Sequence, residues 1–289
     1  MTILVTGATG NVGRRVIDQL LDASAKVRAV SRDPATATLP AGVQTIRGDL
    51  NDPATLTEAL HGIKRIFLFP VPETAQRVAS LAREAGVDHV VVLSSAAVTA
   101  GYDTSFHLPV ERAVERAGLT WTHVRPGEFA LNKLYLWGPG IRADRTVRDP
   151  FPNAVEIPTH EADIADVAAT ALLGDGHAGK AYTFAGPGPV THREQVAAIA
   201  AAIGDDISFD QVSPEEAREY YRKQGGWAAA NADYLLGFED YEGDQTSEPE
   251  AGHEWDAAAV PALKTAEQVT GKPGRTFAEW ALDHSDDFR

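Results

Sequence analysis

Residues 6–13 read Thr-Gly-Ala-Thr-Gly-Asn-Val-Gly, and this stretch decides the fold. It directly follows a β-branched run at residues 2–6 and leads into residues 11–23, whose apolar positions recur with the period of a helix. A strand, a glycine-rich turn and a helix in this order are the context that a dinucleotide-binding fingerprint requires. We therefore predict that the chain opens with the first strand–turn–helix unit of a nucleotide-binding sheet.

Each glycine of this turn has a separate physical role. Gly7 permits the tight turn, Gly10 lets the backbone approach a pyrophosphate, and Gly13 lets the helix lie against the strand. The first turn of the helix adds unpaired N–H groups and a partial positive charge. We expect a dinucleotide to contact Gly7, Thr9, Gly10, Asn11, Val12 and Gly13. The spacing is G-x-x-G-x-x-G rather than G-x-G-x-x-G, so a glycine-rich turn without a ligand is the alternative.

Strand and helix patterns alternate through the first half of the chain. Strands are predicted at 2–6, 26–30, 43–47, 65–69, 89–93 and 120–124, and helices at 11–23, 53–60, 73–85 and 107–117. In the second half, strands are predicted at 155–157 and 181–184, and helices at 161–173, 192–202, 214–223 and 277–284. Three of those later helices begin with a capping box, at Thr191/Glu194, Ser213/Glu216 and Thr276/Glu279.

These patterns predict an α/β fold in which a doubly wound parallel sheet of the Rossmann type carries helices on both faces. A smaller, mainly C-terminal α+β domain is expected to bind the substrate. We place the cofactor-binding domain at residues 1–153 and the substrate or cap domain at residues 154–289. Part of the segment 155–185 is expected to return to the first sheet.

Composition limits the possible functions. The 289 residues carry 26 Lys and Arg against 41 Asp and Glu, a net charge of −15, and include no cysteine. Without cysteine there is no disulfide, thiolate metal site or cysteine nucleophile. Residues 1–150 hold 17 basic and 15 acidic side chains, whereas residues 151–289 hold 9 and 26, and eight of those acidic residues fall within 239–256. We therefore expect no binding to nucleic acid and a substrate that is neutral rather than anionic.

Other classes of site and location are also disfavoured. The longest apolar runs are of strand length, so we expect no membrane span. Residues 2–6 enter the glycine turn with no basic leader, so we expect a cytoplasmic protein, either a monomer or a homodimer. His253, Glu254 and Asp256 lack the helical spacing of zinc ligands, and we expect no metal.

The residues after the second strand indicate which dinucleotide binds. An NAD site places Asp or Glu there for the 2′-hydroxyl of the ribose, but this chain has Ser31 and Arg32, which suit a 2′-phosphate. We therefore expect NADP(H), with a solvated loop arginine as the alternative. Further cofactor contacts are expected from Asp49, Leu50, Pro70 and Ser94, which follow later strands. The alternatives are that Asp49 only caps the next segment and that Pro70 only ends its strand.

With these residues in place, the chain resembles the NmrA-like family, a group of atypical short-chain dehydrogenase/reductases. The resemblance covers essentially the whole chain and rests on TGATGNVG (6–13), Ser31-Arg32, GDLND (48–52), VVVLSSAA (90–97), the His107 helix, THVRPGEF (122–129), ADIADVAA (162–169) and VTGKPGRTFAEW (269–280). It implies a Rossmann domain that binds NADP(H), a smaller domain that closes over it, and a substrate in the cleft between them.

The residues expected to act on the substrate differ from the usual Ser, Tyr and Lys of the wider superfamily. Ser95 matches the serine, but His107 and Glu111 stand where Tyr-x-x-x-Lys would fall. His107 can act as a general acid, Glu111 can hold its ring because the two lie one helical turn apart, and Ser95 can bind a carbonyl oxygen. The alternative is that His107 and Glu111 form only a local helix pair.

The pocket itself is expected after the sixth strand, at Phe129, Asn132, Leu136 and Trp137, which could equally be core. Together these features predict an NADPH-dependent oxidoreductase that transfers hydride to a small electron-poor acceptor, namely a quinone, an enone or a ketone. The missing Tyr and Lys leave a second interpretation, a non-catalytic NADP(H) sensor that binds a protein partner. A third uses the bound cofactor for isomerisation or dehydration.

Overall fold

The computed structural model describes residues 1–240, 243–246 and 264–289. The described residues fall into two units. The first comprises Met1–Pro126, Glu161–Phe184 and Ala266–Lys272, and the second comprises Gly127–His160, Pro273–Arg289 and the described part of Ala185–Thr265. The first segment of the first unit thus ends at residue 126, ahead of the boundary expected at 153, and the chain returns to this unit at residues 161–184 and 266–272.

The first unit is built on seven parallel strands in the order β9-β6-β5-β4-β1-β2-β3. Their bounds are β1 Thr2–Val5, β2 Lys26–Ser31, β3 Gln44–Arg47, β4 Arg65–Leu68, β5 His89–Leu93, β6 Thr120–Pro126 and β9 Lys180–Ala185. This order contains the 3-2-1-4-5-6 arrangement of the Rossmann fold. The predicted doubly wound parallel sheet is therefore confirmed.

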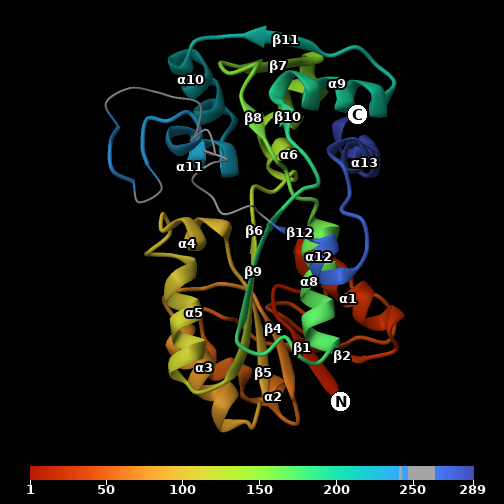
Figure 1. The fold of residues 1–289 in the computed structure, drawn as a ribbon, viewed down its shortest axis with the longest axis vertical. Helices are drawn as coiled ribbons and strands as arrows, with labels where there is room; N and C mark the ends of the chain where they lie inside the picture. The colour runs from red at the N-terminus through yellow and green to blue at the C-terminus, as the bar shows by residue number, and fades with distance from the viewer. Residues whose placement is uncertain (241–242, 247–263) are drawn as a thin grey trace. The chain divides into compact units, whose positions relative to one another are not determined.

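Helices cover both faces of this sheet (Figure 1). They are α1 Asn11–Asp22, α2 Thr57–Leu60, α3 Ala75–Glu84, α4 Ala96–Ala100, α5 His107–Arg116, α8 Glu161–Leu173 and α12 Glu267–Thr270, with a 3-10 turn, η1, at Pro53–Leu56. Helices α1 and α8 pack together on one face, and α3 and α5 on the other. The segment expected as one helix at 53–60 is split between η1 and α2, with proline at the start of η1.

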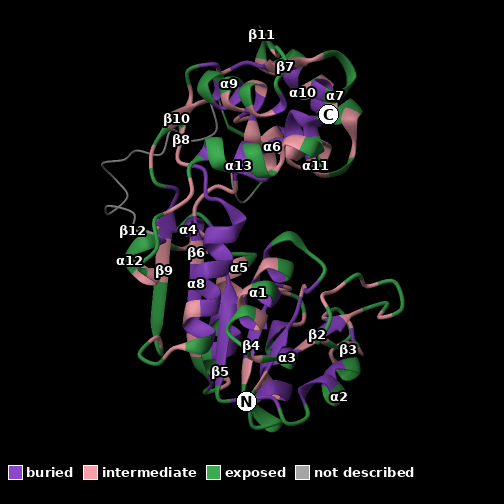
Figure 2. Ribbon diagram, turned by 90° about the vertical axis from the view of Figure 1, so that its right-hand side faces the viewer, coloured by how far each residue is buried: buried purple, intermediate pink, exposed green. Residues whose placement is uncertain are grey.

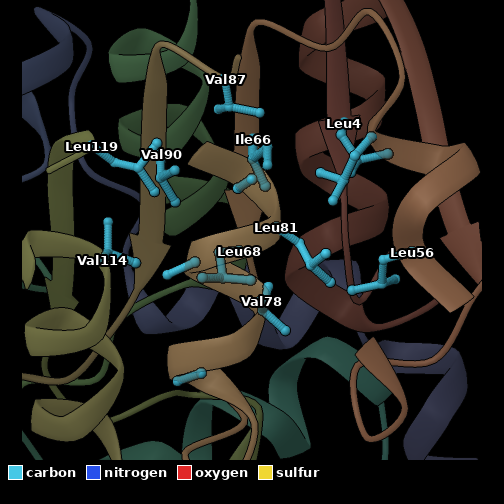
Figure 3. Close-up of a cluster of buried hydrophobic side chains, with 14 of the residues drawn as sticks. Leu4, Leu56, Ile66, Leu68, Val78, Leu81, Val87, Val90, Val114 and Leu119 are labelled. Carbon is cyan, nitrogen blue, oxygen red and sulfur yellow. The ribbon is translucent and has the colours of Figure 1, made fainter. Parts of the chain in front are cut away.

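Apolar side chains from one helical layer fill the space against the sheet. Leu4, Ile66, Leu68 and Val90 point from the strands toward Val78, Leu81, Val114 and Leu119 of the covering segments, as Figure 3 shows. Figure 2 shows burial concentrated on the central strands and on α8, whereas β9 begins exposed. The buried sheet holds the carboxyl ends of β1, β4, β5 and β6 at one edge, where ligands of such sheets bind.

The second unit is mostly helical. Its elements are α6 Asn132–Leu136, α7 Gly138–Asp144, β7 Thr146–Asp149, β8 Val155–Glu156, β10 Val190–Thr191, α9 His192–Ile203, β11 Ser208–Gln211, α10 Pro214–Gln224, α11 Gly226–Leu235, β12 Lys264–Thr265, α13 Phe277–Asp283 and η2 Ser285–Phe288. Strand β7 pairs with β11 in parallel, and β8 with β10 antiparallel. All three predicted capping boxes are present, at the starts of α9, α10 and α13.

Candidate cofactor and catalytic site

The glycine-rich turn joins the end of β1 to the start of α1. The side chain of Thr6 links the end of β1 to the end of β4: its Oγ1 accepts the N–H of Phe69, the residue after β4, at 2.8 Å. Gly7 has a φ of +60°, in the left-handed region that glycine favours, and its carbonyl accepts the N–H of Gly10 at 3.0 Å. A Cβ on Gly13 would lie 2.2 Å from the carbonyl oxygen of Gly7, so only glycine fits where the helix meets the turn.

The start of α1 suits an anion. Gly10 is the N-cap and has no side chain to cap the helix. Asn11 is exposed, whereas the side chain of Val12 is buried in the core, so Val12 can offer only its backbone to a ligand. Since the first N–H groups of a helix have no intrahelical partners and lie at its positive end, a pyrophosphate fits this turn.

A pocket of about 560 Å³ lies beside the turn, formed entirely by residues of the first unit. It has the size of a cofactor subsite. Six of the residues predicted to bind the cofactor line it, namely Gly7, Thr9, Ser31, Arg32, Asp49 and Leu50. The structure therefore brings the glycine turn, the end of β2 and the loop after β3 to one hollow, as a bound dinucleotide requires.

Other residues of this pocket escaped the sequence interpretation. They include Arg14, Asp33, Thr36, Thr38, Phe69 and Val71. The carboxylate of Asp33 accepts the N–H of Ala35 at 3.1 Å. Arg14 could have been found from its place one residue after the glycine motif, on the first turn of α1. Pro70 is buried between two lining residues and is not itself in the lining.

The pocket contains both cationic and anionic side chains. Arg14 and Arg32 are both exposed and both line it, together with the hydroxyl group of Ser31. Asp49 also lines it, and its pKa is below the ordinary value because the N–H and side chain of Asn51 donate to it and Arg32 adds a positive charge. Two guanidinium groups beside a hydroxyl form a site that can take a phosphate.

His107 at the start of α5 is paired with an aspartate. Its Nδ1 lies 2.5 Å from Oδ2 of Asp103, which is fully buried and also accepts the N–H groups of Phe106 and His107. Burial alone would raise the pKa of Asp103, but these hydrogen bonds outweigh it and lower the pKa to about 2. The expected partner, Glu111, is therefore corrected to Asp103, which holds the imidazole from the preceding loop.

Glu111 binds other groups. Its carboxylate accepts the Oγ–H of Ser94 at 2.6 Å and two N–H groups of Arg125, from Nε at 2.8 Å and from Nη2 at 2.5 Å. Helical spacing placed Glu111 one turn from His107, but its side chain turns toward the sheet. The hydroxyl of Ser94 therefore donates to Glu111, and Ser94 is buried. Its side chain is thus not available to contact a cofactor in this arrangement.

Ser95 follows the end of β5 and is the N-cap of α4. Its Oγ accepts the N–H of Ala97 at 3.2 Å and keeps its own proton for donation. The left-handed Gly101, with φ +80°, ends α4 after five residues. Ser95 and the Asp103–His107 pair thus flank one short helix at the carboxyl edge of the sheet.

The expected substrate residues lie in the second unit. Leu136 and Trp137 belong to its apolar core, with 5% and 2% of their surfaces exposed. Phe129 and Asn132 are half-buried at the start of the unit. Phe129 and Asn132 stay candidates for contact with a substrate, and Leu136 and Trp137 take the core position that was the open alternative.

A cluster of charged side chains occupies the second unit beside this segment. Lys133 on α6 is 2% exposed, and its Nζ lies 2.8 Å from Glu156 and 3.2 Å from Glu128. His192 on α9 lies between Glu156, at 2.9 Å, and Asp149, at 3.1 Å. The sequence did not reveal the cluster because its members come from five segments between residues 128 and 192 that no helical or strand period relates.

The remaining expectations concern absences. Among residues 1–240, 243–246 and 264–289, no helix is long and apolar enough to cross a membrane. In the same part of the chain, no group of three or more His, Asp or Glu side chains is placed to hold a metal ion. His253, Glu254, Asp256 and most of the acidic stretch 239–256 lie outside the described residues.

Comparison with known proteins agrees with this geometry. Residues 7–175 match a protein family described as NAD(P)H-binding. The (4-alkanoyl-5-oxo-2,5-dihydrofuran-3-yl)methyl phosphate reductase of Streptomyces griseus is 36% identical over 294 residues, which cover 99% of each chain. The NAD(P)H azoreductase of Xenophilus azovorans is 32% identical over 306 residues, which cover 98% of each chain.

A solved structure shares the fold over nearly the full length. An NADPH-dependent quinone oxidoreductase of Escherichia coli superimposes with a TM-score of 0.77 at 25% identity. The alignment covers 97% of this chain and 98% of that one. The similarity therefore extends beyond the seven-stranded sheet.

Proposed function

The chain belongs to the NAD(P)H-binding family as an atypical short-chain dehydrogenase/reductase, and we propose that it is an NADPH-dependent oxidoreductase that reduces a small, electron-poor organic acceptor. The observation that carries the proposal is the pocket in which Arg14 and Arg32 lie beside the glycine turn. The acceptor is a quinone, an enone or a ketone, and it is neutral rather than anionic.

The preference for NADPH follows from charge. A 2′-phosphate carries about two negative charges at neutral pH. Arg32 at the end of β2 and Arg14 on α1 can share it, with Ser31 as a hydroxyl donor. The pocket also contains Asp33 and Asp49, but Asp33 bonds to Ala35 and Asp49 to Asn51, so both carboxylates are partly used by their own loops.

The residues of the first unit supply a proton and an oxygen-binding group. When bound, NADPH supplies the hydride. Asp103 accepts the Nδ1 proton of His107 and so leaves Nε2 as the atom that carries and donates the transferable proton. Protonated His107 then donates to the acceptor oxygen as negative charge develops there, and the free Oγ–H of Ser95 stabilises the same oxygen.

The acceptor class follows from the modest acid chemistry available. A quinone or an enone spreads the arriving charge over conjugated atoms and needs less help from an acid than an isolated ketone does. The names of the Streptomyces and Escherichia relatives refer to an oxo-dihydrofuranylmethyl phosphate and to quinones, which are both conjugated acceptors. Neutrality of the acceptor is supported by the acidic second half of the chain, which holds 9 basic and 26 acidic residues.

A steady-state assay tests the proposal. Loss of the reduced-nicotinamide absorbance is followed with NADPH or NADH and a panel of quinones, enones and ketones. The panel includes one hydroxymethyl butenolide and its phosphate ester, which differ only in charge. We expect turnover with NADPH, a preference for conjugated acceptors, and faster turnover of the uncharged butenolide.

Two results would contradict the proposal. Tight binding of NADPH without turnover of any acceptor would favour the non-catalytic sensor. Turnover of the phosphate ester alone would retain the reductase but remove the neutral substrate. Arg32→Ala tests the contribution of Arg32 to the use of NADPH. Arg83→Ala, on the exposed face of α3 and away from the pocket, is its control.

A further inference from the structure

Arg125, near the end of β6, connects two helices that flank the proposed catalytic residues. Its Nε and Nη2 donate to the two carboxylate oxygens of Glu111 on α5, and its Nη1 donates to Oγ1 of Thr99 on α4 at 3.2 Å. Both helices lie beside β6 (Figure 1). One guanidinium group therefore fastens the end of α4 and the first turns of α5 to the same strand.

The segment between these two helices carries the Asp103–His107 pair. Residues 101–106 leave α4 and enter α5, and they are held at the first end by the N–H groups of Tyr102 and Asp103, which donate to the carbonyl of Ala97. At the other end, Asp103 accepts the N–H groups of Phe106 and His107. The position of the imidazole thus depends on how α4 and α5 are placed relative to each other.

Glu111 extends the connection to the end of β5. It is 1% exposed, and its carboxylate accepts the hydroxyl of Ser94 as well as the two N–H groups of Arg125. Burial raises the pKa of Glu111, but the hydrogen bonds from Arg125 outweigh it and hold the pKa below its ordinary value. The carboxylate therefore stays charged and links the Ser94–Ser95 turn, β6 and α5 at a single point.

We propose that Arg125 and Glu111 are positioning residues that set His107 and its partner Asp103 against the Ser94–Ser95 turn; this inference rests on the proposed function. Neither residue needs to touch the acceptor. Arginine is required because its planar fork can bind both carboxylate oxygens and still reach Thr99, whereas the point charge of lysine cannot.

Two variants of the Arg125–Glu111 pair distinguish an effect on the position of His107 from an effect on stability. Arg125→Lys keeps the positive charge but loses the planar guanidinium group that binds both carboxylate oxygens. The double variant Glu111→Gln/Arg125→Met leaves no charge buried without a partner, so it keeps the fold even where a single substitution does not. We expect kcat with NADPH and a quinone to fall about 10- to 100-fold in both variants, because small misplacements of a catalytic group have effects of this size. The KM for NADPH is expected to change less than about twofold, since the cofactor pocket is not involved.

An NMR measurement reports on position without turnover. A proton on Nδ1 of His107 that is hydrogen-bonded to Asp103 is expected to give a downfield resonance in the wild type. We expect that resonance to shift or broaden in both variants. The matched control is Glu115→Gln, which removes the neighbouring α5 carboxylate that bonds to His123 at 3.1 Å and does not reach Ser94.

The outcomes separate the two proposals. The positioning role is supported if the folded variants of Arg125 and Glu111 show a lower kcat and a changed His107 resonance, and if Glu115→Gln shows neither. Wild-type kcat and an unchanged resonance in the folded double variant would overturn it, as would equal effects in Glu115→Gln. If the wild type reduces no acceptor, the proposed function fails, and the resonance alone then decides whether Arg125 positions His107.

Discussion

Each of the two units places histidine next to carboxyl groups, but the pKa of a carboxyl group is lowered in the first unit and raised in the second. In the first unit, Asp103 accepts hydrogen bonds from His107 and from the backbone, and its pKa falls to about 2. In the second unit, burial and the charge of Glu156 raise the pKa of Glu128 to about 7. His192 there lies between two carboxylates, whose charges overcome its burial and raise its pKa to about 9.

The difference comes from the ratio of anions to cations. The second unit places three carboxyl groups, Glu128, Glu156 and Asp149, around two cations, Lys133 and His192. Because like charges repel in such a cluster, the pKa of one carboxyl rises, and Glu128, at 3.2 Å, lies farther from Lys133 than Glu156 does, at 2.8 Å. Residue type therefore does not determine charge; the local set of neighbours does.

The largest expected effect is on stability, when the central cation of the second unit is removed. Lys133→Met leaves the partly buried Glu156 and Glu128 without the ammonium group that both of them contact. We expect the free energy of unfolding to fall by about 3–5 kcal/mol, measured by chemical denaturation. The control is Lys223→Met, which breaks an exposed pair with Glu219 and should cost less than about 0.5 kcal/mol. Equal losses in the two variants would show that the buried cluster contributes no more than a surface pair.

Substitution of His107 or Asp103 in the first unit should lower activity more than it lowers stability. We expect His107→Ala and Asp103→Asn each to lower kcat by about 100-fold, because one removes the proposed acid and the other its orienting carboxylate. Steady-state kinetics with NADPH and a quinone measure this. Full activity in His107→Ala would remove His107 as the proton donor, while the reductase itself would stand.

The two units should also respond oppositely to pH. Glu128 has a folded-state pKa of about 7, above the ordinary 4.5, so the stability it contributes is present below pH 4.5 and is lost as the pH rises through 7. His89 in the first unit has its pKa lowered by burial from 6.5 to about 4, so its contribution is present above pH 6.5 and is lost as the pH falls through 4. Hydrogen exchange resolved by unit measures both slopes in one experiment.

A variant isolates the response of the second unit. Glu128→Gln keeps the shape but cannot ionise, so the fall of about 1–2 kcal/mol that we expect in that unit between pH 4.5 and 7 should disappear. The slope of the first unit should be unchanged. A pH dependence that survives in Glu128→Gln would assign the titration to another group.

The smallest expected effect concerns the cofactor. Arg32→Ala should raise the KM for NADPH by about 10-fold, roughly 1.4 kcal/mol, and leave the KM for NADH nearly unchanged. Arg14→Ala should have a similar but weaker effect, because Arg14 comes from α1, whereas Arg32 directly follows Ser31 at the end of β2. If the ratio of the two KM values does not change in Arg32→Ala, the 2′-phosphate lies elsewhere.

Local patterns predicted most of the fold. The glycine turn, the alternation of strands and helices and the three capping boxes depend on residues close in sequence, so a single chain reveals them. Helix α8 spans Glu161–Leu173, which is the range predicted from the sequence pattern. Helix α4 was missed because five residues between an N-cap Ser95 and the left-handed Gly101 leave no period to detect.

Side-chain partners were harder to predict than elements. Helical spacing brings Glu111 within reach of His107, and the sequence could not show that Arg125 of β6 and Ser94 compete for the same carboxylate. Asp103 was missed because it lies in a loop, where no period relates it to His107. Nor could the order of patterns place the boundary between units, since the chain leaves the first unit at residue 126 and returns at residue 161.

Transfer of isotopic label tests the central claim most directly. NADPH deuterated at the reactive carbon of the nicotinamide is incubated with the purified protein and an enone or a ketone, because these acceptors keep the transferred hydride on carbon, and the product is analysed by mass spectrometry. The account predicts a reduced product that carries one deuterium at the carbon that receives the hydride, with much slower formation in His107→Ala. Saturable binding of NADPH with no labelled product from any acceptor would contradict it.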